Sequence, residues 1–527
     1  MTDPLAGLPR VTYANAASDF SALHAVFDRE LPAFAARETG RDAANHVGGD
    51  ADPGGERYAV ASPIDARLTL GTLVAADAAA VDRAVAAARA AAPVWRATPW
   101  QDRVAALRRA AASIRRDRLA LAMASLLEVG KSRLEAMGEV EESIDLIEYY
   151  CDQVEAAQGW DRDLAAGPGG ERGHDRLRPY GTFAVIAPFN YPIALAVGMT
   201  TGALLGGNSV VLKPAPGAAL SAPALARVFE EAGLPAGVFN LVCGDRDTGA
   251  RLAAHEGIDG VAFTGSHEVG MQLMRAAVAG RFAKPVLAEL GGKNAAFVTA
   301  SADLDAAASG VARSAFGLSG QKCSSCSKVY VHRDVRDAFV ERMLGLASRL
   351  VVGDPRAAGT FTGPVIGEAS ARRFEAAVRA ARDAGAAVLA GGMRLGDDAR
   401  AHGAYLSPTV VADAAPEHEV NRRELFVPLL SMQSFDSLAA AIDDANRSAL
   451  GLSAGVYARD AAEVALFDDR IEAGVLYANR PSGATTGAWP GFQTFCGWKG
   501  SGATGKGGLG PFYVQQFMRE QCRTSAA

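Results

Sequence analysis

Phe183-Ala184-Val185-Ile186 and Ser209-Val210-Val211-Leu212 are two short apolar runs, separated by a segment long enough to form a helix. Runs of this length that are rich in apolar and β-branched residues predict buried strands. Val238–Val242 and Val261–Phe263 repeat the pattern, again with helix-like segments between them. Strands that alternate with helices predict an α/β fold, with a parallel sheet covered by helices on both faces.

The alternation resumes at Asn294–Val298 and continues to about residue 478, which predicts a second α/β unit. Residues 1–55 are mixed in character and become rich in Gly and Asp towards their end, so we expect an N-terminal arm. Near the C-terminus, Phe512–Phe517 alternates like a strand. Ahead of the first sheet, apolar residues recur at helical spacing in three segments, 77–92, 101–129 and 131–158.

The segment 183–212 is apolar enough and long enough to span a bilayer. Prolines, an asparagine and several glycines interrupt it, and lipid would leave the backbone groups at those breaks unsatisfied. We therefore expect a strand, loop, helix and strand inside a protein core, and no membrane segment. The N-terminus lacks the basic and apolar regions of a secretory signal, so we expect a cytoplasmic protein.

The composition is that of a globular chain of two or more domains. The chain has 527 residues and a net charge of −6, and its basic residues are scattered. This distribution argues against a nucleic-acid partner. The 6 cysteines are too few and too scattered for a disulfide framework, and are typical of reduced thiols in a cytosolic protein.

Gly320-Gln321-Lys322-Cys323-Ser324-Ser325-Cys326-Ser327 places a cysteine in a short polar loop, between a helix-like segment (304–316) and a strand-like run (329–331). A structural cysteine prefers an apolar face, whereas glycine, serines and a lysine could stabilise a thiolate. Glu289 ends an apolar run earlier in the chain. A nucleophile needs a base near it in space rather than in sequence, so Cys323 and Glu289 are a candidate pair for covalent catalysis.

Cys323 and Cys326 also form a Cys-x-x-Cys pair. A zinc site would need a second pair, or histidines at ligand spacing, and His332 stands alone, so we expect no metal. Two interpretations stay open. Either Cys326 packs inward and never meets Cys323, or oxidation closes a reversible disulfide between them.

Three more segments follow predicted strands, where sheets of this kind bind ligands. In Phe263-Thr264-Gly265-Ser266-His267-Glu268-Val269-Gly270, glycines would let the backbone approach a diphosphate at a helix N-terminus, but a plain turn explains the spacing equally well. Lys213 ends a strand and is either a ligand contact or solvated. Asn190, between two prolines, is either an Asx-turn residue or a carboxamide donor to an oxyanion.

Taken together, these segments resemble the aldehyde dehydrogenase superfamily, in order from about residue 56 to 515. The motifs that carry the resemblance are Pro188-Phe189-Asn190, Leu212-Lys213-Pro214, Phe263-Thr264-Gly265-Ser266, Glu289-Leu290-Gly291-Gly292-Lys293, Gly320-Gln321-Lys322-Cys323 and Glu424-Leu425-Phe426. Within the superfamily the chain is most similar to the 1-pyrroline-5-carboxylate (glutamate γ-semialdehyde) dehydrogenases. That narrower resemblance is carried by residues 320–327, Glu142-Ser143-Ile144-Asp145-Leu146, Thr486-Gly487-Ala488 and Gln493-Thr494-Phe495.

The resemblance implies a fold of three parts after the N-terminal arm (1–55). These are a Rossmann-type dinucleotide-binding domain (56–160 and 181–290), an α/β catalytic domain (291–490) and a small β oligomerisation flap (161–180 and 506–527). An unpaired edge strand in such a flap would be a liability. We therefore expect a homodimer or a larger homo-oligomer.

The resemblance also implies NAD(P)-dependent oxidation of an aldehyde to a carboxylic acid, here glutamate γ-semialdehyde to glutamate, as in proline breakdown. Cys323 would attack the aldehyde, Asn190 and the Cys323 backbone N–H would hold the oxyanion, and Glu289 would activate water. The cofactor-binding residues carried over are Lys213, Gly265, Ser266, Gly270, Glu424 and Phe426. The substrate-binding residues carried over are Glu142, Phe189, Ser324, Gly487, Ala488 and Phe495, with Glu142 at the α-ammonium.

The chain departs from this subfamily near the substrate anchor. Thr494-Phe495-Cys496-Gly497 replaces Pro-Phe-Gly-Gly, Trp489 stands where a small aliphatic residue is usual, and Val427 replaces a glycine. Another semialdehyde or an aromatic aldehyde therefore stays an alternative substrate. A CoA-acylating enzyme and a non-catalytic homologue are alternatives of other kinds, against which the intact catalytic residues argue. Pro216 stands where many NAD-specific relatives have an acid, so we expect NAD as the cofactor with NADP also accepted.

Overall fold

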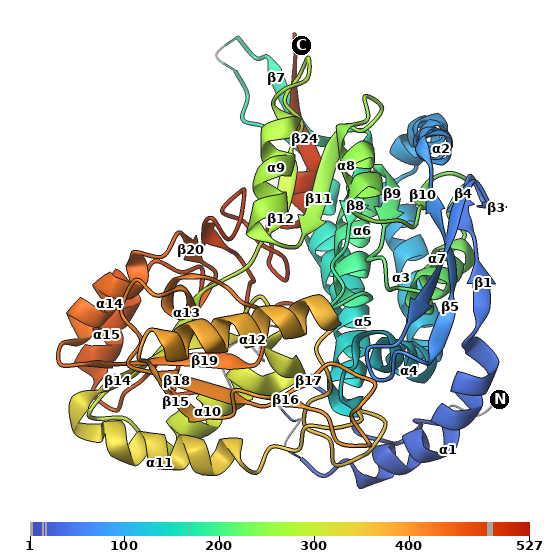
Figure 1. Ribbon diagram of the computed structural model, residues 1–527. Coiled ribbons are helices and arrows are strands. Elements are labelled where there is room, and N and C mark those ends of the chain that lie inside the picture. The colour runs from blue at the N-terminus through green and yellow to red at the C-terminus, as the bar shows by residue number, and fades with distance from the viewer. Residues whose placement is uncertain (1–3, 13–14, 16–17, 168, 482–488, 527) are drawn as a thin grey trace.

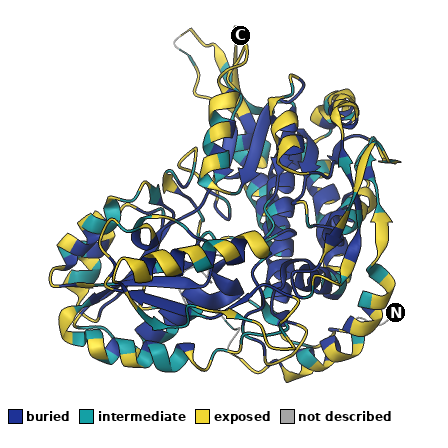
Figure 2. Ribbon diagram, viewed as in Figure 1, coloured by how far each residue is buried: buried dark blue, intermediate teal, exposed yellow. Residues whose placement is uncertain are grey.

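The computed structural model describes residues 1–527 except 1–3, 13–14, 16–17, 168, 482–488 and 527. Figure 1 shows two lobes, one formed mainly by the N-terminal half of the chain and one mainly by the C-terminal half. A small sheet, which includes β7 and β24, projects from the first lobe. In Figure 2 the two large sheets are mostly buried, and exposed residues lie on the outer faces of helices and in loops.

A seven-stranded sheet organises the first lobe, in the order β12-β11-β8-β9-β10-β2-β3. From β8 the chain moves outward through β9 and β10, and then returns to place β11 and β12 on the other side of β8. This reversal creates a switch point between β8 and β11, where open α/β sheets bind ligands. The parallel strands are β8 (Thr182–Ile186), β9 (Ser209–Lys213), β10 (Phe239–Leu241), β11 (Gly260–Thr264) and β12 (Val286–Glu289).

Helices cover both faces of this sheet. The strand, loop, helix and strand predicted for 183–212 are confirmed as β8, α6 and β9, and no described helix is long and apolar enough to cross a membrane. The helical segment predicted at 101–129 is two helices, because the backbone leaves helical geometry at Asp117 (φ −97°, ψ 13°). The helices are α2 (Ala78–Ala97), α3 (Trp100–Arg116), α4 (Arg118–Val129), α5 (Arg133–Ala156), α6 (Ala194–Leu205), α7 (Ser221–Glu231), α8 (Arg246–Ala254) and α9 (His267–Ala277).

The N-terminal residues contribute to the first lobe. Helix α1 (Ser21–Glu38) buries five apolar side chains, and β2 (Asn45–Val47) extends the large sheet by antiparallel pairing with β10. Strand β3 (Asp50–Asp52) pairs with β2 at the sheet's edge. A separate three-stranded sheet contains β1 (Arg41–Ala43), β4 (Gly55–Ala61) and β5 (Thr69–Ala76).

The second lobe has its own seven-stranded sheet, in the order β15-β18-β19-β14-β13-β21-β22, parallel except for β15. Its strands are β13 (Asn294–Val298), β14 (Cys326–His332), β15 (Ala387–Ala390), β18 (Thr409–Ala412), β19 (Leu429–Phe435), β21 (Ser453–Tyr457) and β22 (Val475–Ala478). Its helices are α10 (Leu304–Phe316), α11 (Arg336–Ala347), α12 (Glu368–Asp383), α13 (Glu419–Arg422), α14 (Leu438–Asn446) and α15 (Ala461–Arg470). The predicted helix and strand on either side of Cys323 are therefore confirmed.

The remaining strands form one small three-stranded sheet and two two-stranded ladders. The projecting sheet consists of β6 (Asp161–Asp163), β7 (Arg172–Pro179) and β24 (Met518–Ser525), all antiparallel. Two-stranded ladders join β16 (Arg394–Leu395) to β17 (Tyr405–Leu406), and β20 (Leu450–Gly451) to β23 (Trp498–Lys499).

The strand predicted at Phe512–Phe517 is wrong. Val514–Phe517 form a 3₁₀ helix, and Val514 and Phe517, three residues apart, are both buried. Phe517 packs on Gly202 of α6 so closely that a Cβ there would lie 2.5 Å from the ring. Packing against α6 thus overrides the local alternation, and the strand begins only at Met518.

A buried ion pair joins three helices of the first lobe. Glu139 of α5 accepts hydrogen bonds from Lys131 Nζ (2.6 Å) and from Ser125 Oγ of α4 (2.5 Å). Its other oxygen accepts the backbone amides of Ile193 (2.9 Å) and Ala194 (3.3 Å), where α6 begins. Burial lowers the pKa of Lys131, whereas the Glu139 carboxylate raises it.

Lys131→Met should lower the free energy of unfolding by about 3–5 kcal/mol, because Glu139 would stay buried without its counter-charge. Urea unfolding followed by circular dichroism measures the change. The double variant Lys131→Met/Glu139→Gln should recover part of the loss, since it removes the uncompensated charge. If Lys131→Met lowered the free energy of unfolding by less than about 1 kcal/mol, the buried ion pair would not be important for stability.

Candidate active site

One cavity is lined by side chains from both lobes. Glu142, Leu146 and Tyr150 follow one another at intervals of four on α5, so one face of that helix forms a wall. The cavity brings together five residues predicted from the sequence: Glu142, Glu289, Cys323, Ser324 and Phe495. The other lining residues are Tyr191, Ala194, Leu195, Gly198, Met199, Thr264, Lys322, Gly508, Leu509 and Tyr513.

Cys323 lies in the loop that leads into β14, and Asn294 holds this loop in place. The Asn294 side-chain amide donates to the carbonyls of Cys323 (2.7 Å) and Ser325 (3.0 Å), and its oxygen accepts the Ser453 amide (3.0 Å). Asn294 was not among the residues predicted from the sequence. A polar residue at the start of an otherwise apolar strand, next to the Gly-Gly-Lys motif, was the available signal.

In the chain alone, the polar loop does not lower the pKa of the Cys323 thiol. Burial raises the pKa of the Cys323 thiol far above its usual range, and the carboxyl groups of Glu424 and Glu289 raise it further. Backbone N–H groups in the loop offset only part of this. The lysine beside the cysteine does not help, because Lys322 pairs with Glu135 at 2.8 Å.

Glu289 ends β12 and lines the same cavity as Cys323. Burial raises the pKa of Glu289 to about 8, and a long hydrogen bond from the Gly508 amide (3.3 Å) opposes the rise. The other carboxyl oxygen is buried and has no hydrogen-bond partner among the described residues. A carboxyl group with a pKa close to the working pH is suited to act as a general base.

Asn190 reaches the cysteine loop rather than closing a local turn. Its side-chain amide donates to the Gln321 carbonyl at 2.8 Å, two residues before Cys323. A carboxamide has two N–H donors, and this is the one bond that its nitrogen makes among the described residues. Phe189, expected at the substrate, packs edge-on against Phe426 (ring centroids 5.9 Å apart) instead of lining the cavity.

The predicted cofactor residues lie at the carboxyl ends of the first sheet. Lys213 Nζ donates to the carbonyls of Pro214 (2.8 Å) and Gly244 (2.9 Å), and burial lowers the pKa of Lys213 to about 8. Gly265 and Ser266 connect β11 to α9, and the Ser266 hydroxyl caps that helix at the Val269 amide (3.4 Å). Gly270 packs on Leu290, where a Cβ would lie 2.3 Å from the side chain. This helix N-terminus opens at the switch point of the sheet, a place that attracts anionic ligands.

Glu424 approaches the same region from the second lobe. Its carboxyl group accepts the Gly292 amide at 3.0 Å, and burial raises the pKa of Glu424 to about 7. Phe426 follows two residues later with a positive φ of 58°, which is uncommon for a residue other than glycine.

The remaining predicted residues are placed differently. Gly487 and Ala488 lie outside the described residues. Cys326 is buried in the core of the second lobe with Sγ 3.4 Å from the Lys328 carbonyl, whereas Cys323 lines the cavity, so the structure favours the interpretation that Cys326 packs inward. No group of three His, Cys, Asp or Glu side chains in the described ranges could hold a metal ion.

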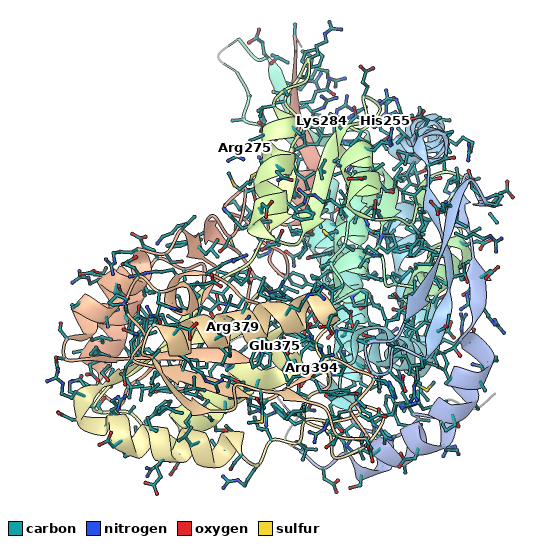
Figure 3. All side chains as sticks on the ribbon, in the orientation of Figure 1. His255, Arg275, Lys284, Glu375, Arg379 and Arg394 are labelled. Carbon is teal, nitrogen blue, oxygen red and sulfur yellow. The ribbon has the colours of Figure 1, made fainter. Side chains whose placement is uncertain are left out.

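Another hollow lies beside α12 in the second lobe, and Figure 3 labels three of the residues that line it. Glu375, Arg379 and Arg394 line it, with charges of both signs, and Arg394 already pairs with Glu368 at 2.8 Å. None of the predicted site residues lines this hollow.

Comparisons with known proteins agree with the motifs. The chain matches the aldehyde dehydrogenase family over residues 51–522. A 1-pyrroline-5-carboxylate dehydrogenase from Geobacillus thermodenitrificans (strain NG80-2) is 34% identical over 487 residues, which cover 92% of each chain. A 1-pyrroline-5-carboxylate dehydrogenase from Thermus, solved with bound NAD, has a TM-score of 0.90 and 32% identity over 98% of this chain and 99% of that one.

A longer protein also contains this fold. Proline utilization A (PutA) from Bdellovibrio bacteriovorus, solved after inactivation by N-propargylglycine, has a TM-score of 0.90 and 32% identity, covering 96% of this chain and 52% of that one. The present chain thus corresponds to about half of that protein. The resemblance predicted from the motifs is confirmed by both sequence and fold: the chain belongs to the aldehyde dehydrogenase family.

Proposed function

We propose that the protein oxidises L-glutamate γ-semialdehyde to L-glutamate with a nicotinamide cofactor. One observation supports the assignment of this substrate. A buried carboxyl group, Glu142, lines the same mostly apolar cavity as Cys323 and Glu289. The apolar walls suit the methylene chain of the substrate, and Glu142 suits its ammonium group. Ser324, beside the nucleophile, offers a hydroxyl to the carboxylate. Relatives at 34% identity that bear the name of this activity support the assignment.

The residues divide the work between two half-reactions. Cys323 attacks the aldehyde carbon, and the Asn190 amide and Cys323 N–H stabilise the oxyanion. When bound, the oxidised nicotinamide would accept the hydride that the thiohemiacetal must lose to become a thioester, and its positive charge would favour the thiolate. Glu289 then takes a proton from water, which attacks the thioester and releases the carboxylic acid.

The cofactor site would be built from elements that already fit a dinucleotide. Ser266, Gly265 and the start of α9 would face the diphosphate, with Gly270 allowing α9 to pack closely on Leu290. Lys213 would hold the adenosine ribose, and Glu424, with Phe426 beside it, the nicotinamide ribose. We propose NAD as the principal cofactor, with NADP accepted.

The projecting sheet supports assembly into a homo-oligomer. Strand β24 is an edge of its sheet, and six of its eight residues are exposed in the single chain. Pairing of this edge with a second copy would cover backbone groups that are otherwise open to non-specific association. The six free cysteines agree with a reducing compartment, the cytoplasm.

Glu289→Gln should keep the first burst of reduced cofactor but slow steady turnover by about 100-fold or more, because the thioester would lack its base. In wild type, turnover should rise as the pH passes through about 8, since only the Glu289 carboxylate can accept a proton. The variant should lose this rise. Stopped-flow absorbance measures both phases, and Cys323→Ala serves as a control without a burst. Equal loss of burst and turnover in Glu289→Gln would assign Glu289 an earlier role.

The efficiencies with NAD and NADP should differ by less than about 100-fold, since Lys213 could pair with the 2′-phosphate. NADP should lose ground against NAD above about pH 8, because Lys213 is then deprotonated. Initial rates with each cofactor across pH 6.5–9 test this, with Lys213→Met expected to remove the pH dependence of the ratio. A preference above 100-fold for NAD would contradict the assignment.

Glutamate γ-semialdehyde should be oxidised at least about 100-fold more efficiently than butanal, since two or more charge-assisted hydrogen bonds contribute about 1.5–3 kcal/mol each. Glu142→Ala should reduce kcat/KM for the semialdehyde by about 10- to 100-fold and leave butanal unchanged. Asp152→Ala, which removes an exposed carboxylate from the same helix, is the matched control. A ratio near one in wild type would reject this substrate in favour of another aldehyde.

A further inference from the structure

We propose that Arg10, in the N-terminal segment, is a positioning residue for the amino-acid end of the substrate. This inference rests on the proposed function and extends it to a residue outside the cavity. Arg10 contacts two segments that border the cavity, helix α5 and the turn that begins at Trp489. It fixes them relative to each other.

The guanidinium of Arg10 holds α5 at two points one turn apart. Nε donates to the Glu141 carboxylate at 2.8 Å, and Nη2 lies 3.0 Å from the Asp145 carboxylate. The Glu141 side chain is only 5% exposed. In the described part of the chain, Arg10 is the one cation that pairs with it, so this buried charge depends on the N-terminal segment.

This contact lies directly beside Glu142 on α5. Glu142 directly follows Glu141, and successive side chains on a helix are about 100° apart around its axis. A clamp on Glu141 and Asp145 therefore adds a restraint, beyond the Glu139 contacts, on the rotation of the adjacent face, the one that presents Glu142 to the cavity. It also places one positive charge between two carboxylates that lie next to the face of α5 bearing Glu142.

Arg10 also contacts Trp489, at the start of the turn that leads to Phe495. Trp489 donates its indole N–H to the same Asp145 oxygen that Arg10 approaches, and the guanidinium lies 6.0 Å from the centre of the Trp489 ring. The Trp489 carbonyl accepts the amides of Phe492 (3.0 Å) and Gln493 (3.1 Å). The turn so formed leads to Phe495, a cavity residue.

The same connection continues to the catalytic base. The Phe495 amide donates to the Gly508 carbonyl at 2.9 Å, and the Gly508 amide donates to Glu289 at 3.3 Å. The turn that begins at Trp489 thus connects the Arg10 contacts to Phe495, and through Gly508 to Glu289.

Arg10 belongs to a folded segment. Its carbonyl accepts the Asn15 side-chain amide (2.8 Å), and the Asn15 oxygen accepts the Thr12 amide (2.7 Å). Leu5 and Val11, on either side of Arg10, are buried. The segment can therefore hold the guanidinium in one position rather than letting it sample many.

The test is a substrate-dependent loss. Arg10→Ala should raise KM for glutamate γ-semialdehyde at least tenfold while changing kcat less than threefold and leaving butanal oxidation unchanged. Arg10→Lys keeps the charge but lacks the two-armed guanidinium. Its KM for the semialdehyde should therefore lie between the values for wild type and Arg10→Ala. Trp489→Phe should act in the same direction, and Arg10→Ala/Trp489→Phe should be less than additive because both act through Asp145. Arg29→Ala, at an exposed pair on α1, is the matched control.

Hydrogen exchange gives a readout without substrate. In Arg10→Ala, the amides of Phe492 and Gln493 should exchange faster, while α11 in the other lobe stays unchanged. Unchanged KM and unchanged exchange in Arg10→Ala, in an enzyme whose wild type prefers the semialdehyde, would overturn the role of Arg10 alone. A wild type without that preference would instead reject the proposed substrate, and the binding role of Arg10 with it.

Discussion

Glu139 accepts four hydrogen bonds at one buried point, from α4, from the loop before α5 and from the start of α6. A buried carboxylate is tolerated only when its oxygens are satisfied, so this contact permits little freedom in how α5 and α6 meet. Those two helices supply most of the apolar wall of the cavity. Lys131, the partner of Glu139, also lies 3.7 Å from the centre of the Tyr191 ring, which faces the cavity. The shape of the site thus depends on a polar contact just behind it.

Burial brings the pKa values of four ionisable groups around the site close to neutral. It raises the pKa of Glu289 to about 8 and that of Glu424 to about 7, and it lowers the pKa of Lys213 to about 8 and that of Lys293 to about 7. Each group therefore changes charge at a pH close to neutral. A site of this kind holds few fixed charges, and small changes in its surroundings are enough to move a proton onto or off the base.

The sequence predicts those parts of the structure that leave a local signal. Strands β8 and β9, helix α10 and the cavity residues Cys323 and Glu289 all lie in short motifs. The Cys323 pKa could not be predicted, because a polar composition does not say where the polar side chains point. Asn294, Arg10 and the Gly508 amide were missed for another reason: their partners lie far away in the sequence, 131 positions for Arg10 and Glu141. Such contacts exist only once the separate segments have come together in the fold.

The segment from Gly508 to Ser525 contributes both to the cavity and to the projecting sheet. Its first residues donate a hydrogen bond to Glu289 and pack aromatic rings on α6, and it then continues without a break into the projecting edge strand β24. The two parts belong to one continuous segment, so we expect a truncation that removes β24 to disturb the packing of the residues that surround the base. Damage at this end would be recorded in an assay as poor turnover, even though every catalytic side chain were intact.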